Sequence, residues 1–135
     1  MNNNIQHINP EGLLKNPAFS QVVTTQGSGK TIYISGQNSI NEKREIIGKG
    51  DLHAQTIQAL QNIQTALSAC NATFENVVKL CIYMVQGQDL YSGFQASQKI
   101  MGGIANPPAI SVLIVTGLAN PDFLVEIDAL AFVPE

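Results

Sequence analysis

The sequence is poor in charge, and its few basic residues are scattered. Charged side chains make up 13% of the 135 residues, about half the usual share of a soluble domain. The only adjacent basic pair, Lys43 and Arg44, lies between Glu42 and Glu45. A nucleic-acid-binding surface needs a concentrated positive stripe, so the sequence predicts no nucleic-acid partner.

Cysteines, histidines and long apolar runs are also scarce. Cys70 and Cys81 fall in different predicted elements and make no disulfide framework. His7 and His53 lack the spacing of metal ligands, so we expect no metal and no cofactor. No apolar run reaches the ~18–20 residues of a membrane span, and residues 1–6 show no signal-peptide pattern. The sequence therefore predicts a cytoplasmic protein with no membrane partner.

Apolar periodicity and turn-forming residues predict an α+β fold in one domain, residues 1–135. The clearest element is a helix over 52–70, which begins after Asp51 and ends before Asn71, with apolar residues every three or four positions. A second helix over 89–101 starts at Asp89. The predicted strands are 19–25, 31–35, a short one around 46–47, 77–85, 109–116 and 123–133.

The order of these elements predicts how they pack. We expect 19–25 and 31–35 to form a hairpin through residues 27–30. The segment 109–116 is apolar on both faces, which predicts a central strand. Hairpins at both ends with helices between them indicate a mixed sheet with both helices on one face. The other face then needs a cover, and the low charge favours another copy of the chain.

The last strand carries two carboxylates on one face. Glu126 and Asp128 are two positions apart, or roughly 6.5–7 Å, and share this face with the apolar Leu124, Leu130 and Phe132. Either this part of the strand faces water, or one carboxylate lines a cleft. In a cleft, partial desolvation would raise its pKa towards that of a useful acid or base.

Two other groups leave a structural and a functional interpretation open. One face of strand 77–85 carries Lys79, Cys81 and Tyr83. Either this face is half exposed, with Cys81 as a small core residue, or it forms a polar site. Residues 35–37, Ser-Gly-Gln, end a strand with exposed backbone amides. These amides either receive a ligand oxygen or belong to a turn.

Taken together, these segments resemble the RidA/YjgF family, also known as the endoribonuclease L-PSP family, in order over nearly the whole chain. The matching stretches include NPAFSQ at 16–21, IYISGQ at 32–37, VVKLCIY at 77–83, PPAISV at 107–112 and VEIDA at 125–129. The resemblance implies a chorismate-mutase-like fold and a homotrimer whose sheets line a central barrel. It also implies small-molecule clefts between subunits and a hydrolase of the enamine/imine deaminase type.

In such deaminases an arginine after the proline binds the substrate carboxylate through two hydrogen bonds, and a glutamate on the last strand positions the attacking water. The resemblance assigns the catalytic glutamate to Glu126. An asparagine that many members carry on the second helix has no counterpart in 89–101. The corresponding ligand-binding positions are Phe19, usually a tyrosine, with Ser35, Gly36, Gln37 and Ile110.

Ile110 occupies the arginine position, and Arg44, the only arginine of the chain, lies outside the motif. Isoleucine cannot pair with a carboxylate, which leaves three hypotheses. The clefts bind a small neutral or weakly polar molecule, and hydrolyse it if it is an imine or enamine without a carboxylate. Alternatively the trimer is a non-catalytic binding or regulatory module. The third hypothesis is a weak 2-iminobutanoate/2-iminopropanoate deaminase in which Lys79 or another group replaces arginine.

Overall fold

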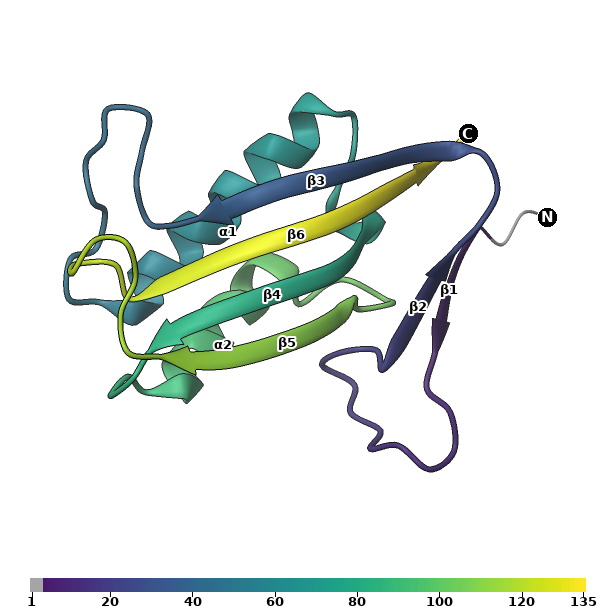
Figure 1. Cartoon of the computed structure of the whole chain (residues 1–135), viewed down its shortest axis with the longest axis horizontal. Helices are drawn as coiled ribbons and strands as arrows, with labels where there is room; N and C mark the ends of the chain where they lie inside the picture. Colours follow the sequence, from purple (N-terminus) through teal and green to yellow (C-terminus); the bar gives the residue numbers. More distant parts are fainter. Residues whose placement is uncertain (1–3) are drawn as a thin grey trace.

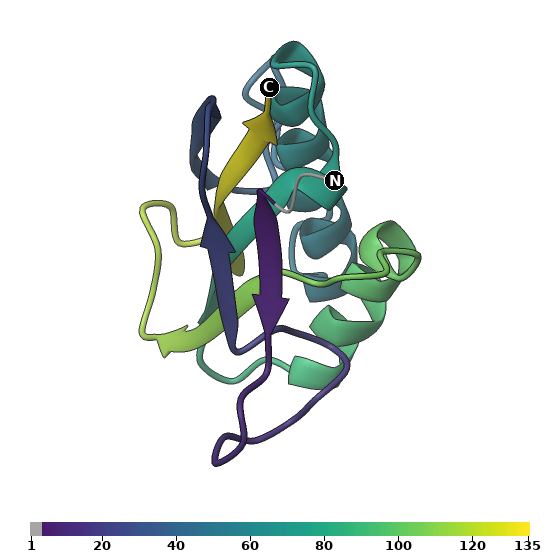
Figure 2. The same cartoon turned by 90° about the vertical axis from the view of Figure 1, so that its right-hand side faces the viewer.

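Two helices cover one face of a four-stranded sheet, and a short two-stranded ribbon lies at one end (Figures 1 and 2). This computed structural model describes residues 4–135; residues 1–3, part of the stretch without a signal-peptide pattern, lie outside it. The elements are β1 Ile5–Ile8, β2 Val22–Thr25, β3 Gly29–Gln37, α1 Leu52–Ala69, the 3-10 helix η1 Phe74–Asn76, β4 Val77–Val85, α2 Leu90–Met101, β5 Ala109–Val115 and β6 Val125–Pro134. Among the described residues no helix is long and apolar enough to cross a membrane.

The strand order of the large sheet is β3-β6-β4-β5. The strand β6 pairs antiparallel with both β3 and β4, whereas β4 and β5 are parallel. Figure 2 shows α1 and α2 on the same side of this sheet. The predicted α+β class, the mixed sheet and the two helices on one face are therefore confirmed.

The predicted pairing of the strands is wrong at both ends of the chain. β2 pairs with β1, from Ile5↔Thr25 to Ile8↔Val22, and β3 pairs with β6 instead of β2. β6 enters the sheet between β3 and β4, so it forms no hairpin with β5. The physical reason lies in β3, whose Ile32 and Ile34 are buried in the main core and hold this strand against β6.

Two further expectations are corrected. The segment around 46–47 forms no strand but one isolated bridge, Ile40↔Ile46. β5 lies at an edge of the sheet, not at its centre, and leaves Val112, Leu113 and Ile114 about half exposed. An apolar pattern on both faces predicts burial, but it does not say whether the cover comes from the same chain.

The helices form where the sequence predicts them. The Asp51 carboxylate accepts a hydrogen bond from the Ala54 N–H at 3.1 Å, and Asp89 caps α2 in the same manner. Asn71 follows α1 with a φ of 57°, the left-handed conformation expected of an asparagine at this place. The inner face of α1 packs Leu60, Ile63 and Leu67 against the sheet, at 1% exposure or less.

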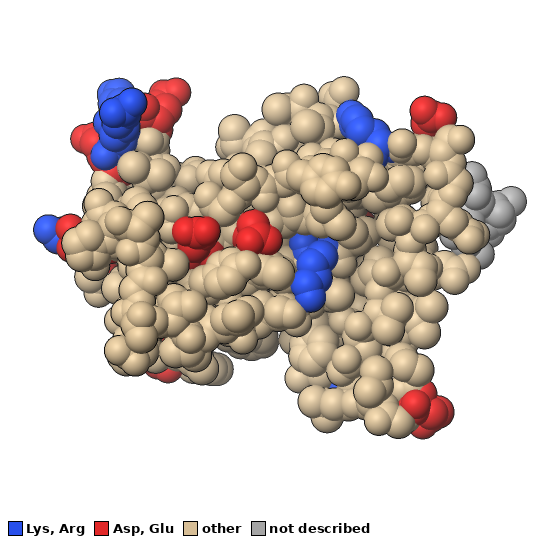
Figure 3. All heavy atoms as spheres, viewed as in Figure 1, with Lys and Arg blue, Asp and Glu red and all other residues tan. Residues whose placement is uncertain are grey.

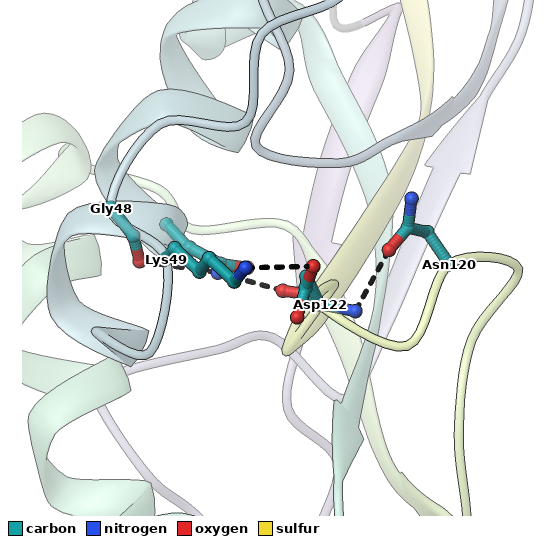
Figure 4. Close-up of polar contacts among 5 residues, drawn as sticks. Gly48, Lys49, Asn120 and Asp122 are labelled. Carbon is teal, nitrogen blue, oxygen red and sulfur yellow. Dashed lines mark hydrogen bonds and ion pairs between the residues drawn. The ribbon is translucent and has the colours of Figure 1, made fainter.

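A buried amide joins α1 to the loops that precede α1 and β6. The side chain of Gln55 is fully buried; its Nε2 donates to the carbonyls of Gly48 and Asp122 at 3.2 and 3.0 Å, and its Oε1 accepts from the Leu124 N–H at 2.9 Å. Figure 4 shows Lys49 and Asn120 on either side of Asp122. Lys49 Nζ forms an ion pair with the Asp122 carboxylate at 3.4 Å, and the Asp122 N–H donates to Asn120 Oδ1 at 2.8 Å. These contacts fix the start of β6 and so the position of Glu126.

Candidate functional site

A cavity of about 340 Å³ lies between α2 and the helix-covered face of the sheet. Leu80, Ile82 and Met84 of β4 line its floor together with Ile110 and Val112 of β5. Its volume is at the lower end of the range of ligand pockets, ~300–1,000 Å³. The cavity therefore fits a one-ring molecule better than a large ligand.

The composition of α2 explains the open space. This helix buries only the small residues Gly93 and Ala96, whereas the larger Leu90 and Phe94 are about half exposed. A Cβ at Gly93 would lie 2.7 Å from the Cε of Met84, so the helix approaches β4 closely where it has no side chain. Small residues on the inner face of α2 leave room beside this contact.

The lining of the cavity is almost wholly apolar. Of the described residues that line it, none is ionisable. The hydroxyl of Thr56 donates to the Leu52 carbonyl and that of Ser97 to the Phe94 carbonyl, each at 2.8 Å. Both hydroxyl protons are thus used within their own helices. The arrangement can hold an uncharged molecule, but it offers an anion no counter-charge.

Two of the predicted ligand-binding residues, Phe19 and Ile110, meet in this cavity. The segment that carries Phe19 is tied to the segment before β5: the Ser20 N–H donates to the Pro108 carbonyl at 2.9 Å, and the Ser20 hydroxyl to the Pro107 carbonyl at 2.6 Å. His7 Nδ1 lies 3.0 Å from the same Pro107 oxygen. These contacts bring the stretches 16–21 and 107–112 together.

The other predicted site residues lie on the opposite face of the sheet. Glu126 is in register with Tyr83, whereas Ile110 is in register with Leu80 of the core. Because neighbours on a strand point to opposite faces, Tyr83 and Leu80 lie on different sides of β4. A single chain therefore does not bring Glu126 and Ile110 together.

Glu126 and the turn 35–37 do lie side by side. The half-buried Glu126 accepts a hydrogen bond from Asn38 Nδ2 at 3.3 Å. A Cβ at Gly36 would collide with its carboxylate, so only glycine permits this close contact. Ser35 is exposed and Gln37 half-buried. The carboxylate and the backbone of this turn thus form one polar corner on the open sheet face.

The open face of the sheet carries more polar groups (Figure 3). The Asp128 carboxylate, as a hydrogen-bond acceptor and as a negative charge, raises the pKa of Tyr83 to about 12. Lys79 Nζ donates to the Ser111 hydroxyl at 2.9 Å. Sequence reasoning placed Lys79, Cys81 and Tyr83 on one face, but it did not pair them with Asp128 or Ser111, because pairing depends on register.

Comparisons with known proteins agree with this fold. The family model described as endoribonuclease L-PSP matches residues 13–133. A RutC family protein of Pyrococcus horikoshii is 31% identical over 114 residues, which cover 84% of this chain and 86% of that protein.

Solved structures give the same result. YyfB from Yersinia pestis, a protein of unknown function of the conserved Rid family, has a TM-score of 0.85 and 35% identity and covers 96% of this chain and 99% of its own. A Mycobacterium tuberculosis member of the YjgF/YER057c/UK114 family has a TM-score of 0.65 and 30% identity, with coverage of 84% and 86%. This chain therefore belongs to the RidA/YjgF family, whose family model is described as endoribonuclease L-PSP.

Proposed function

We propose that this protein is a homotrimer with small-molecule clefts between its subunits, that the cavity of each chain forms part of one cleft, and that each cleft takes an uncharged ligand instead of a 2-imino acid. The observation that carries the proposal is the position of Ile110 in an apolar cavity of about 340 Å³. Phe19, which lines the same cavity, has no hydroxyl to offer a ligand. Binding in this cavity is the function that the geometry supports best.

The electrostatics of the cavity favour a neutral ligand. An ionised carboxylate loses its hydration on entering an apolar site and needs a paired charge or several hydrogen bonds in return. Among the lining residues of the described chain there is no cation, and the hydroxyl protons of Thr56 and Ser97 are already donated. The carboxamide of Gln98 is a single neutral donor group, which does not replace a counter-charge. A neutral molecule avoids this desolvation cost and gains from burial of its apolar surface.

Hydrolysis of an uncharged imine is a second candidate, supported by the contact between Glu126 and Gly36. In this reaction a water molecule gives up a proton to the Glu126 carboxylate as its oxygen adds to the imine carbon, and Glu126 passes that proton to the imine nitrogen to give a carbinolamine. Transfer of the carbinolamine hydroxyl proton to the nitrogen then lets the C–N bond break as the C=O bond forms. The products are a carbonyl compound and ammonia, and the carboxylate is regenerated. Because Glu126 and Ile110 lie on opposite sheet faces of one chain, this reaction needs the carboxylate from a neighbouring subunit.

Light scattering coupled to size exclusion tests the assembly. We expect about three times the chain mass of 14.5 kDa, and a stable monomer at micromolar concentration would contradict both the trimer and its clefts. A thermal-shift screen of paired compounds tests the ligand. Neutral ring compounds should raise the unfolding temperature, whereas the carboxylates of the same size should not.

A further inference from the structure

Among the described lining residues, Gln98 is the one whose side chain has a free polar group that could recognise a ligand, and part of this side chain is exposed to solvent. Within residues 4–135 its carboxamide has no hydrogen-bond partner, and it lines the cavity from the last turns of α2. Its Oε1 lies close to Gly102, at the end of the helix; a Cβ built there would be 3.3 Å away. The other polar lining side chains, Thr56 and Ser97, have given their protons to helix carbonyls.

A second, smaller cavity of about 190 Å³ adjoins the first. Six residues line both cavities, so the two spaces share a wall: Ala18, Phe94, Gln98, Met101, Ile104 and Pro107. Gln98 thus lies at the boundary between a larger apolar chamber and a smaller outer one, which is bordered by Pro17 and Gly102.

The backbone carbonyls nearby are already occupied. The Pro107 carbonyl accepts the Ser20 hydroxyl, and the Pro108 carbonyl accepts the Ser20 N–H. The N–H of Gly102 donates to the Gln98 carbonyl at 2.8 Å, and that of Ile104 to the Met101 carbonyl at 3.2 Å. With the hydroxyl protons of Thr56 and Ser97 also donated, the Gln98 amide is the free side-chain donor among the described lining residues.

We propose that the ligand is a neutral molecule with an apolar ring or chain and one hydrogen-bond acceptor, of the ketone, aldehyde or amide class, and that Gln98 determines this specificity. The apolar part fills the chamber lined by Ile110, and the acceptor receives the Gln98 amide N–H at the boundary. The inference rests on the proposed uncharged ligand and adds which polar group that ligand carries. A site built to donate a hydrogen bond disfavours an analogue that lacks the acceptor.

Three probes of similar size separate the requirements: acetophenone, which is neutral with an acceptor; ethylbenzene, which is neutral without one; and benzoate, which is anionic. We expect acetophenone to bind several-fold more tightly than ethylbenzene in NMR titrations of the wild-type protein, and benzoate not to bind. Gln98→Met removes the amide at similar length. It should weaken the affinity for acetophenone about five-fold, which corresponds to the loss of one neutral hydrogen bond. The affinity for ethylbenzene should be unchanged.

Gln95→Met is the matched control, because Gln95 is an exposed glutamine of the same helix that lines neither cavity. It should leave both affinities unchanged. Ile110→Trp, which fills the chamber from β5, should abolish binding of both neutral probes; retained binding would place them elsewhere and overturn the inference.

The outcomes distinguish this inference from the proposed function. Equal affinity for acetophenone and ethylbenzene, or a Gln98→Met variant that weakens both or neither, overturns the role of Gln98 while the uncharged ligand stands. If benzoate binds and neither neutral probe does, the proposed function itself is wrong and the inference falls with it. Thermal unfolding of each variant confirms that it is folded.

Discussion

The two faces of the sheet differ in what they offer a ligand. The helix-covered face has a cavity with an apolar lining that includes Phe19 and Ile110 and contains no ionisable side chain among the described residues. The open face has Glu126, Asp128 and Lys79, none of which lines this cavity. In one chain the binding volume and the acid–base groups are therefore on opposite sides of a single layer, and any chemistry that uses both needs a second copy.

The edge strand β5 belongs to both faces. Its residues Val112, Leu113 and Ile114 point alternately to the two sides, and all are about half exposed. A long apolar edge strand without a partner is an aggregation hazard, which proteins normally cover. The exposed apolar side chains of β5 support the proposed assembly, because nothing in the described part of a single chain covers them.

The largest effect is expected when the apolar cavity is offered a substrate with a carboxylate. We predict that the wild-type protein hydrolyses 2-aminoacrylate or 2-iminobutanoate little faster than water does, because Ile110 cannot hold the substrate carboxylate. The loss of a desolvated, charge-assisted contact costs ~2–5 kcal/mol, or roughly thirty-fold to several thousand-fold in rate or affinity. A coupled assay that generates the imine and follows its disappearance measures this directly.

Ile110→Arg tests the same point from the other side. The guanidinium restores a carboxylate-binding group at the position that the family resemblance assigns to it, so imine hydrolysis should rise above that of the wild-type protein. Phe19 and the absence of a helix asparagine set an upper limit on the gain. Wild-type rates equal to those of an arginine-bearing relative would show that the role assigned to this position is wrong.

A second prediction concerns the buried amide inside the covered layer. Gln55→Met keeps the volume but leaves the Asp122 carbonyl and the Leu124 N–H without a partner. The Gly48 carbonyl loses one of its two hydrogen bonds and keeps the one from the Asp51 N–H. We expect the free energy of unfolding to fall by about 3 kcal/mol, since each unsatisfied buried group costs ~1–3 kcal/mol. Urea unfolding at a fixed protein concentration measures the loss.

The matched control is Gln64→Met, an exposed glutamine of the same helix. It should change the free energy of unfolding by no more than ~0.5 kcal/mol. Equal losses in the two variants would mean that the three hydrogen bonds of Gln55 contribute little beyond helix propensity.

Local signals predicted the helices and β4 well. Asp51, Asp89 and Asn71 mark helix ends through chemistry that depends on neighbouring backbone only, and the structure confirms all three. Pairing was not predictable in this way. β1 has only four residues, which is a weak signal in the sequence. β2 pairs with β1 because β3 pairs with β6, and that pairing depends on the burial of Ile32 and Ile34 in the core.

The candidate site shows the same division. The positions of Phe19 and Ile110 came from the family resemblance, but their shared cavity depends on the contacts that Ser20 makes with the segment before β5. Glu126 lies on the other face of the sheet. This follows from the registers of β4 with β5 and β6, which cannot be predicted from the sequence of any one strand. Gln98 carries no pattern in the sequence that would single it out.

The third prediction sharpens the description of the open face. Tyr83 has a pKa of about 12, raised from 10.0 chiefly by the Asp128 carboxylate. A raised pKa means that the folded state holds this proton more tightly, so the stabilisation is complete below pH 10 and is lost as the pH rises from 10 to about 12. Tyrosinate absorbance during an alkaline titration should therefore show one of the three tyrosines ionising late.

Asp128→Asn removes the negative charge and should bring the late step back towards pH 10, while Tyr83→Phe should delete it. A late step that persists in both variants would belong to Tyr33 or Tyr91, and the electrostatic description of this face would be wrong.

The smallest expected effect is that of Glu126→Gln on stability. The substitution keeps the size of the side chain, so the close contact with Gly36 remains, and the new Oε1 still accepts the 3.3 Å hydrogen bond from Asn38. The carboxylate has no salt bridge among the described residues, so its charge contributes little to the fold. We expect a change of no more than ~0.5 kcal/mol in the free energy of unfolding. Any hydrolysis of a neutral imine, in contrast, should fall by roughly 10²–10⁴-fold, the usual contribution of general acid–base catalysis. A large loss of stability with unchanged hydrolysis would make Glu126 a structural residue of the open face.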